Sequence, residues 1–234
     1  MMKKFLALLA AGLMAGAVSA DTYLDATGDL DSGAPDDFSG FTHLDISQVD
    51  VTSDGINISF IISVVQNPIT APNDWGNYMV GIDTTAGGDS VGNGWSRPIS
   101  MTGMDYWLGA WVNGGGDDGQ AWNYNGASWS GPSALTVSTN ANTVTMTTTL
   151  ASLGLVGGET IKFDVYTSGS GATDGAVDAL SSATPSITTW GAPGNAYDTA
   201  GNGLSYQVVP EPGTIALMGL FGVIAGVRYL RRKQ

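Results

Sequence analysis

Residues 43–64 read HLDISQVDVTSDGINISFIISV, and this stretch decides the fold. Apolar residues fall mostly at alternate positions in 43–51, with one slip between Ile46 and Val49, and the run at 56–64 is again rich in apolar residues. Alternation is typical of a strand with one buried face, and an Asp-Gly turn between two such runs is typical of a β-hairpin. We therefore predict an antiparallel hairpin around the turn at 53–55.

Six further runs outside this hairpin have strand patterns, and glycine-rich clusters such as 86–89, 113–116 and 168–171 separate several of them. About one helical turn is indicated at 151–155. Together with the hairpin, these runs predict an all-β fold, an antiparallel β-sandwich, with a barrel disfavoured because the strand spacing is irregular. The six runs are 77–83, 105–112, 135–138, 143–150, 160–167 and 204–208.

The N-terminus has the parts of a secretory signal peptide. Lys3 and Lys4 give a positive start, residues 5–18 are apolar, and Val18-Ser19-Ala20 supplies the small residues that a signal peptidase reads. We expect a signal peptide over 1–20 and a folded body over 21–208. A non-cleaved membrane anchor is the alternative, which the small-residue site disfavours.

The C-terminus has three parts in order. Val209-Pro210-Glu211-Pro212-Gly213 comes first, and its two prolines hold the backbone extended and exclude helix. The uncharged run 214–227 would rise about 21 Å as a helix, less than the roughly 30 Å hydrocarbon core. We predict a membrane helix over 214–230 with its basic end in the cytoplasm; an ordinary tail anchor is the alternative. The basic end consists of Arg228, Arg231, Arg232 and Lys233.

This order of parts, over 209–234, resembles the PEP-CTERM sorting signal of exported bacterial proteins. The resemblance implies that an exosortase-type processing enzyme cuts at or near the Pro-Glu-Pro triplet. It also implies a transient stay in the inner membrane, through the C-terminal helix, in a Gram-negative-type bacterium. The body would then reach the cell surface or the exopolysaccharide matrix. Such a signal specifies an address and a processing step, not a biochemical activity.

The body between the two ends is strongly acidic. Arg97 and Lys162 are its only cations against twenty acids, all Asp except Glu159, which gives a formal charge of −18. Such a surface repels nucleic acid and anionic headgroups, so we expect no nucleic-acid partner, whereas neutral sugars and divalent cations are tolerated. Cysteine is absent, which excludes disulfides and thiolate chemistry.

Five of the seven tryptophans fall within 35 residues, at 95–129. Trp107 and Trp111 have even spacing on one predicted strand and therefore face the same side of the sheet. Trp122 and Trp129 lie in a polar, glycine-rich segment with little core to bury them. Aromatic faces beside polar side chains suit stacking on sugar rings, so we predict a glycan site on these four tryptophans. Core packing is the alternative, above all for Trp107 and Trp111. The predicted partners for sugar hydroxyls are Asp117, Asp118, Asn123 and Asn125.

Several segments of the body are similar to parts of the sandwich domains related to family 9 carbohydrate-binding modules, the DOMON-like group. They are YLDATGD at 23–29, the hairpin at 44–60, YMVGIDT at 78–84, LASLGL at 150–155 and FDVYTS at 163–168. The resemblance implies a β-sandwich of this jelly-roll type with a tendency to bind sugar. It assigns no individual binding residue, because aromatic positions vary within the group.

Aspartates gather in loops and suggest calcium as a cofactor. Asp25, Asp29 and Asp31 lie close together in the sequence, and Asp83 and Asp89 bracket a glycine loop. Carboxylate oxygens suit Ca²⁺, and extracellular domains use millimolar sites. The sequence from Asp29 resembles the start of an EF-hand loop, but its twelfth position is glycine and not glutamate, so that motif fails. Turn formation and solubility are the alternative roles.

No catalytic signature is present in the sequence. His43 is the only histidine, so a Ser-His-Asp triad would depend on it alone, and zinc ligands are nearly absent from the body. Paired aspartates for glycoside hydrolysis are expected by chance among so many acids. We therefore expect an exported, non-enzymatic, glycan-binding protein. A structural matrix protein without a specific ligand is the alternative, and a glycosidase is the least favoured class.

Overall fold

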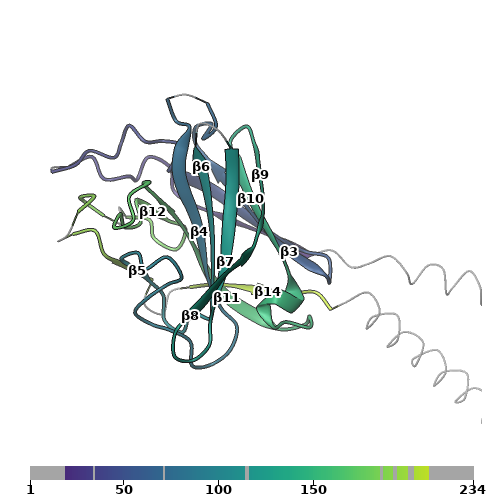
Figure 1. Cartoon of the computed structure of the whole chain (residues 1–234). Helices are drawn as coiled ribbons and strands as arrows, with labels where there is room; N and C mark the ends of the chain where they lie inside the picture. The colour runs from purple at the N-terminus through teal and green to yellow at the C-terminus, as the bar shows by residue number, and fades with distance from the viewer. Residues whose placement is uncertain are drawn as a thin grey trace, which may run out of the picture.

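The computed structural model describes residues 19–210, apart from 34, 71, 114–115, 185–186, 192–193 and 200–202 (Figure 1). These residues form fourteen strands and one short 3₁₀ helix, η1. The elements are β1 (Ser19–Leu24), β2 (Ile46–Ser53), β3 (Asn57–Val64), β4 (Trp75–Asp83), β5 (Ile99–Ser100), β6 (Tyr106–Asn113), β7 (Gly116–Tyr124), β8 (Trp129–Ala134), β9 (Thr136–Asn140), β10 (Thr143–Thr149), η1 (Leu150–Leu153), β11 (Thr160–Ser168), β12 (Asp178–Ala179), β13 (Tyr197–Asp198) and β14 (Leu204–Gln207).

Two antiparallel sheets pack face to face. The first sheet has the order β1-β2-β3-β10-β9, and the second has the order β12-β11-β4-β6-β7-β8, with β14 also paired to β11. A small parallel pair, β13 and β5, lies beside them. The prediction of an all-β antiparallel sandwich is confirmed. Its DOMON-like type stays a prediction.

The hairpin that decides the fold is present as β2 and β3. Ser53 pairs with Ile58 across the turn, where Gly55 has a φ of 85° and the Asp54 carboxylate accepts the Ile56 and Asn57 N–H groups. The slip in the alternation has a structural cause, because the register of the two strands shifts between Ile46 and Gln48. Such a bulge inserts one residue and restores the apolar side chains to the buried face.

Buried side chains lie on both faces of the second sheet, in two separate hydrophobic clusters. Tyr78, Val80 and Ile82 of β4 point into the core between the sheets, whereas Met79 points to the opposite face. The opposite face carries a second cluster that includes Trp107. Residues 84–105 and 169–203 supply the cover of this second cluster, through side chains such as Met104 and Tyr197.

Sequence patterns missed one pair of long strands. The segment 116–134, which is polar and glycine-rich around Trp122 and Trp129 and was not predicted to contain a strand, forms β7 and β8, which extend the second sheet from β6. Strand β1 was also missed, and it begins at Ser19, two residues before the expected start of the mature chain. Helix η1 overlaps the predicted helical turn.

Both described ends of the chain lie at the same end of the sandwich (Figure 1). The Tyr206 hydroxyl donates to the Ser19 carbonyl over 3.2 Å, and the Val209 N–H donates to Ser53 Oγ over 3.2 Å. The signal peptide up to residue 18, the rest of the sorting signal and the predicted helix over 214–230 lie outside the described residues. In the part of the chain that is described, no helix has the length and apolarity needed to cross a membrane.

Candidate functional site

Four tryptophans share the outer face of the second sheet, and we call them the tryptophan face: Trp95, Trp111, Trp122 and Trp129. Residues directly opposite on antiparallel strands point to the same side, and Trp107 of β6 lies opposite Trp122 of β7. Trp95 comes from the loop before β5 and lies over Gly109, where an added Cβ would be 2.3 Å from its ring. Only glycine at this position lets the loop pack so closely. The ring of Trp95 also lies 6.1 Å from that of Trp111.

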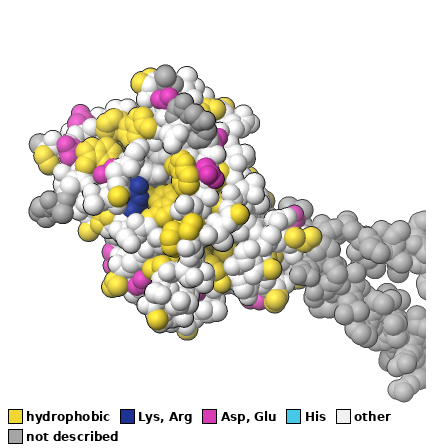
Figure 2. Space-filling view, viewed as in Figure 1, with side chains coloured by type: hydrophobic (Ala, Val, Ile, Leu, Met, Phe, Trp, Pro, Cys, Tyr) yellow, Lys and Arg dark blue, Asp and Glu magenta, His cyan; other side chains and the backbone are white. Residues whose placement is uncertain are grey.

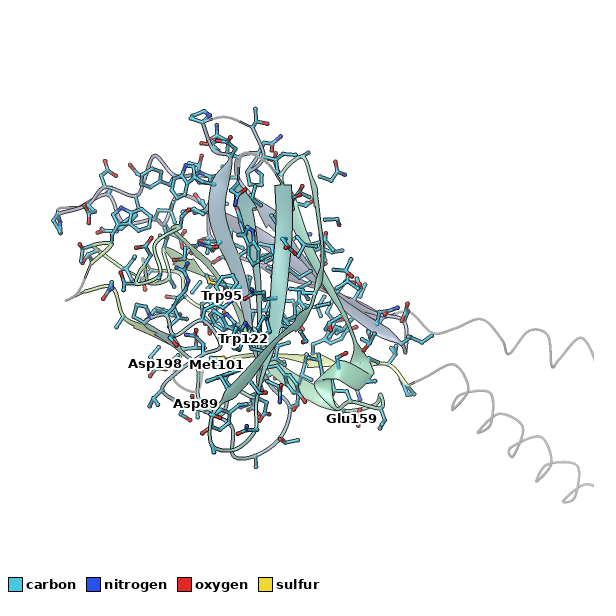
Figure 3. All side chains as sticks on the ribbon, viewed as in Figure 1. Asp89, Trp95, Met101, Trp122, Glu159 and Asp198 are labelled. Atoms are coloured by element: carbon cyan, nitrogen blue, oxygen red, sulfur yellow. The ribbon has the colours of Figure 1, made fainter. Side chains whose placement is uncertain are left out.

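Hydrogen bonds hold three of these rings in place. The Oε1 atom of Gln120 accepts from Trp95 Nε1 over 3.1 Å and from Trp122 Nε1 over 3.3 Å. Figure 3 labels the side chains of Trp95, Trp122 and Asp89 on the ribbon. Asp89 Oδ2 accepts from Trp129 Nε1 over 2.8 Å. Burial acts to raise the pKa of Asp89, but the hydrogen bonds from backbone N–H groups and from Trp129 bring it below its usual value. Asp89 is therefore an ionised acceptor at neutral pH.

All four tryptophans of the face are partly exposed, and Figure 2 shows hydrophobic side chains gathered near the centre of the visible surface of the body. Trp122 is covered in part by two glycines. A Cβ added at Gly94 would be 2.4 Å from Trp122, and one added at Gly131 would be 2.9 Å from its ring. Any ligand therefore contacts the remaining open part of this ring.

Trp107 is a core residue, which corrects its assignment to the glycan site. Its side chain is fully buried, and its ring stacks on that of Tyr166 with centroids 5.9 Å apart. The reason is the loop cover, which the strand pattern alone did not predict. The even spacing of Trp107 and Trp111 does place both on one side of the sheet, as predicted, because both rings contact Trp95.

The predicted polar partners divide between the two sides of the sheet. Asp118 lies opposite Trp111 and shares its face, whereas Asp117 lies opposite the core residue Val112 and accepts from Thr139 of β9. Asn123 lies opposite Tyr106, which packs against the core between the sheets. Asn125 forms the β7–β8 turn, where it accepts the Ala127 and Ser128 N–H groups.

Only Asp118 of those four is therefore placed beside the tryptophan face. Sequence reasoning missed Gln120 and Asp89 as its polar members. Gln120 shares this face because 116–124 forms strand β7, and Asp89 reaches it because its loop folds back towards Trp129. Neither arrangement has a local signal in the sequence.

The predicted calcium ligands also divide. Asp25 and Asp29 lie near Asp45 and Asp178, which sequence reasoning missed because they are far apart in the chain. Asp31 Oδ1 accepts the Gly33 N–H, and Asp31 does not join the group of carboxylates that could share an ion. Asp83 lies near Asp105 and Lys162, and Asp89 binds Trp129. Among the described residues, the loop pair Asp83 and Asp89 forms no such group.

Residues 208–233 match the family model described as the PEP-CTERM protein-sorting motif. The chain carries a PEP-CTERM sorting motif. The motif implies export and exosortase-dependent sorting to the cell surface in bacteria. It begins at the end of the folded body, where the Val208 N–H donates to the Glu159 carbonyl over 2.9 Å.

No curated protein matches the chain. Among solved structures, one from work on pH-induced modulation of Streptococcus parasanguinis adhesion by Fap1 fimbriae is similar at 15% identity and a TM-score of 0.24, covering 68% of this chain and 78% of the other. A likeness of this size carries no argument about the fold or the function.

Proposed function

We propose that this is a non-enzymatic surface protein whose body binds neutral polysaccharide through the tryptophan face. The observation that carries the proposal is a set of four partly exposed tryptophans on one sheet face, three of them fixed by Gln120 and Asp89. Rings held in place before a ligand arrives lose little conformational freedom on binding, which favours affinity. Their apolar faces suit the C–H faces of sugars.

The negative charge of the body favours neutral over anionic polysaccharides. The body has a formal charge of −18 from two cations and twenty acids, so anionic polymers are repelled. Asp118 and Asp89 add acceptors for sugar hydroxyls next to the rings. A neutral, hydroxyl-rich polymer of the exopolysaccharide matrix fits both features.

Delivery would follow the sorting motif. In this proposal the helix over 214–230 holds the chain in the inner membrane of a Gram-negative-type bacterium until an exosortase-type enzyme cuts at or near the Pro-Glu-Pro triplet. The Val209 N–H donates to Ser53 Oγ just before the triplet, so a cut after Pro210 would leave this hydrogen bond intact. Intact-mass measurement of the surface-released protein should show loss of the tail. Retention of Arg231 in the mature form would contradict this route.

His43 does not form a Ser-His-Asp triad among the described residues. Its side chain is buried, and burial lowers its pKa to about 4, so it is neutral at physiological pH. Neither ring nitrogen has a hydrogen-bonded hydroxyl among the described residues, so it does not activate a serine there.

A structural matrix role without a ligand is the second candidate. The observation that favours it is that the indole N–H groups of Trp95, Trp122 and Trp129 are all used within the protein. On this alternative the tryptophan face is only packing under the loops. The two candidates differ in what happens when a partly exposed tryptophan is removed.

Fluorescence titration of the mature protein with neutral polysaccharides tests the proposal. Trp129→Ala should weaken binding roughly 5- to 30-fold, because truncating one anchoring contact removes about 1–2 kcal/mol. Trp75→Ala is the matched control, since Trp75 is also partly exposed but contacts Phe41 and His43 beside the other core cluster. Equal affinities in wild type and Trp129→Ala, or no binding by any neutral polysaccharide, would favour the structural role.

A further inference from the structure

An aspartate cluster lies at the junction of three separate segments. Asp29 comes from the loop after β1, Asp45 directly precedes β2, and Asp178 begins β12. Each offers one carboxylate oxygen, and these oxygens lie within 4.8 Å of one another. Asp45 and Asp178 are only 1% and 2% exposed. Asp25 is close enough to interact electrostatically with Asp29 and Asp45.

Backbone N–H groups orient the carboxylates without satisfying them all. Gly28 N–H donates to Asp45 Oδ2 over 2.8 Å, and Ile46 N–H donates to Asp178 Oδ2 over 2.7 Å. The remaining oxygens, namely Asp45 Oδ1, Asp25 Oδ2 and both oxygens of Asp29, are buried without a hydrogen-bond partner among the described residues. Such orphaned oxygens are rare in folded proteins because burial without a partner is costly.

No described side chain compensates this negative charge. Arg97 donates to Ser168 Oγ and to the Asp174 carbonyl. Lys162 is exposed, and its charge acts to lower the pKa of Asp83, which lies outside the cluster. Burial raises the pKa of Asp25 to about 8, and burial likewise raises the pKa of Asp29, Asp45 and Asp178. An ion of positive charge is the missing partner for the buried oxygens that have no hydrogen bond among the described residues.

We propose that Asp29, Asp45 and Asp178 bind a calcium ion, with the Asp25 carboxylate beside them, and that this ion ties the segment after β1 to the start of β2 and to β12. All of the ligands are carboxylate oxygens, which excludes a typical zinc set of nitrogen and sulfur. Calcium accepts six to eight oxygens in flexible geometry, whereas magnesium requires a small octahedron and usually keeps several waters. The bound ion would balance the negative charge of the cluster and would coordinate the oxygens that have no hydrogen-bond partner.

Two of the segments joined at this site have little regular structure of their own. Strand β12 has only two residues, and the loop from 25 to 31 follows an edge strand. Calcium would therefore close one end of the sandwich once the protein reaches a medium rich in the ion. This role is independent of polysaccharide binding and is measured without any sugar.

Thermal unfolding of the mature protein tests the site, first in EDTA and then with calcium, against NaCl of equal ionic strength. Saturating calcium should raise Tm by roughly 5 °C or more, because binding to the folded state at about 100 times Kd adds about 2.7 kcal/mol. Magnesium should give a smaller rise. Equal Tm values in calcium and NaCl would overturn the proposal.

Two variants assign the response to the cluster. Asp29→Asn should abolish most of the calcium shift, and it should fold, since neither Asp29 oxygen has a hydrogen-bond partner among the described residues. Asp45→Asn should also abolish it, and its folding is checked by circular dichroism. Asp83→Asn is the control, because Asp83 lies outside the cluster and its variant should respond like wild type. A full calcium shift in Asp29→Asn would overturn the assignment.

Discussion

The tryptophan face and the aspartate cluster differ both in how the chain builds them and in whether they are complete. The tryptophan face draws on residues 89–129, mostly on neighbouring strands, and the indole N–H groups of Trp95, Trp122 and Trp129 already have partners. The aspartate cluster draws on segments far apart in the chain, and several of its buried oxygens have none. A surface whose polar groups all have hydrogen-bond partners can stay folded without a ligand. A buried cluster of carboxylates without such partners is stabilised when a cation binds. The two regions should therefore respond differently to the same perturbations.

The largest loss of stability is expected at Trp107, the buried residue beneath the tryptophan face. Trp107→Ala should lower the free energy of unfolding by about 3–5 kcal/mol, because a fully buried aromatic ring is replaced by a cavity. Chemical denaturation measures this loss as a lower midpoint with an unchanged m-value. A loss below about 1 kcal/mol would mean that the second hydrophobic cluster is not a true core.

The titration of Asp25 and that of His43 should change the stability with pH in opposite directions. The pKa of Asp25 is raised to about 8, so the metal-free folded state binds its proton more tightly than the unfolded state, and this stabilisation is lost as pH rises towards 8. The pKa of His43 is lowered to about 4, so its effect is confined to pH below about 6.5. Between pH 6.5 and 8 in EDTA, Tm should therefore fall with rising pH.

Added calcium should reverse or flatten this slope, since deprotonated carboxylates bind the ion. Melting curves at matched ionic strength measure both conditions. A metal-free Tm that rises between pH 6.5 and 8 would contradict the assigned state of the cluster.

A smaller effect is expected at Gln120, which accepts from two indoles. Gln120→Leu should lower stability by about 1–3 kcal/mol, because Trp95 and Trp122 lose their acceptor. Polysaccharide affinity should also fall, although this side chain need not touch the sugar. Tryptophan fluorescence and the same titration measure both results. Asn125→Ala, in the β7–β8 turn, is a control that should leave the emission maximum unchanged.

The smallest effects distinguish the two sides of β7. Asp118→Asn should weaken polysaccharide binding several-fold, since Asp118 shares the face of Trp111. Asn123→Ala should change affinity by less than about 0.5 kcal/mol, because Asn123 points to the other side of the sheet. Equal losses in both variants would show that the ligand wraps around the sheet edge and does not lie on one face.

The fold was largely predictable because its central hairpin is encoded locally. Alternation in 43–64 predicted β2 and β3, and even the slip after Ile46 corresponds to a register shift. Strands β7 and β8 were not predictable in this way. Their glycine, asparagine and aspartate residues have low strand propensity, and pairing with β6 and packing of Trp122 override it.

The parts of the candidate sites that lie close together in the sequence could be predicted, and the parts that come from distant segments could not. The density of tryptophans was visible in the sequence, but the burial of Trp107 depends on loop residues such as Met104 that cover it. Asp25 and Asp29 were visible as a short cluster, whereas Asp45 and Asp178 join them only through the pairing of β11 with β12 and the entry into β2. No local pattern distinguishes these two from the other aspartates.

One crossed measurement tests the central claim that the tryptophan face binds polysaccharide and the aspartate cluster binds calcium as separate sites. Polysaccharide affinity and the calcium-induced shift in Tm are measured on mature wild-type protein, on Trp129→Ala and on Asp29→Asn. We predict that Trp129→Ala loses affinity but keeps the full calcium shift, and that Asp29→Asn keeps affinity, measured where it is folded, but loses the shift. If each variant changes both quantities, or neither variant changes either one, the account of two separate sites is contradicted.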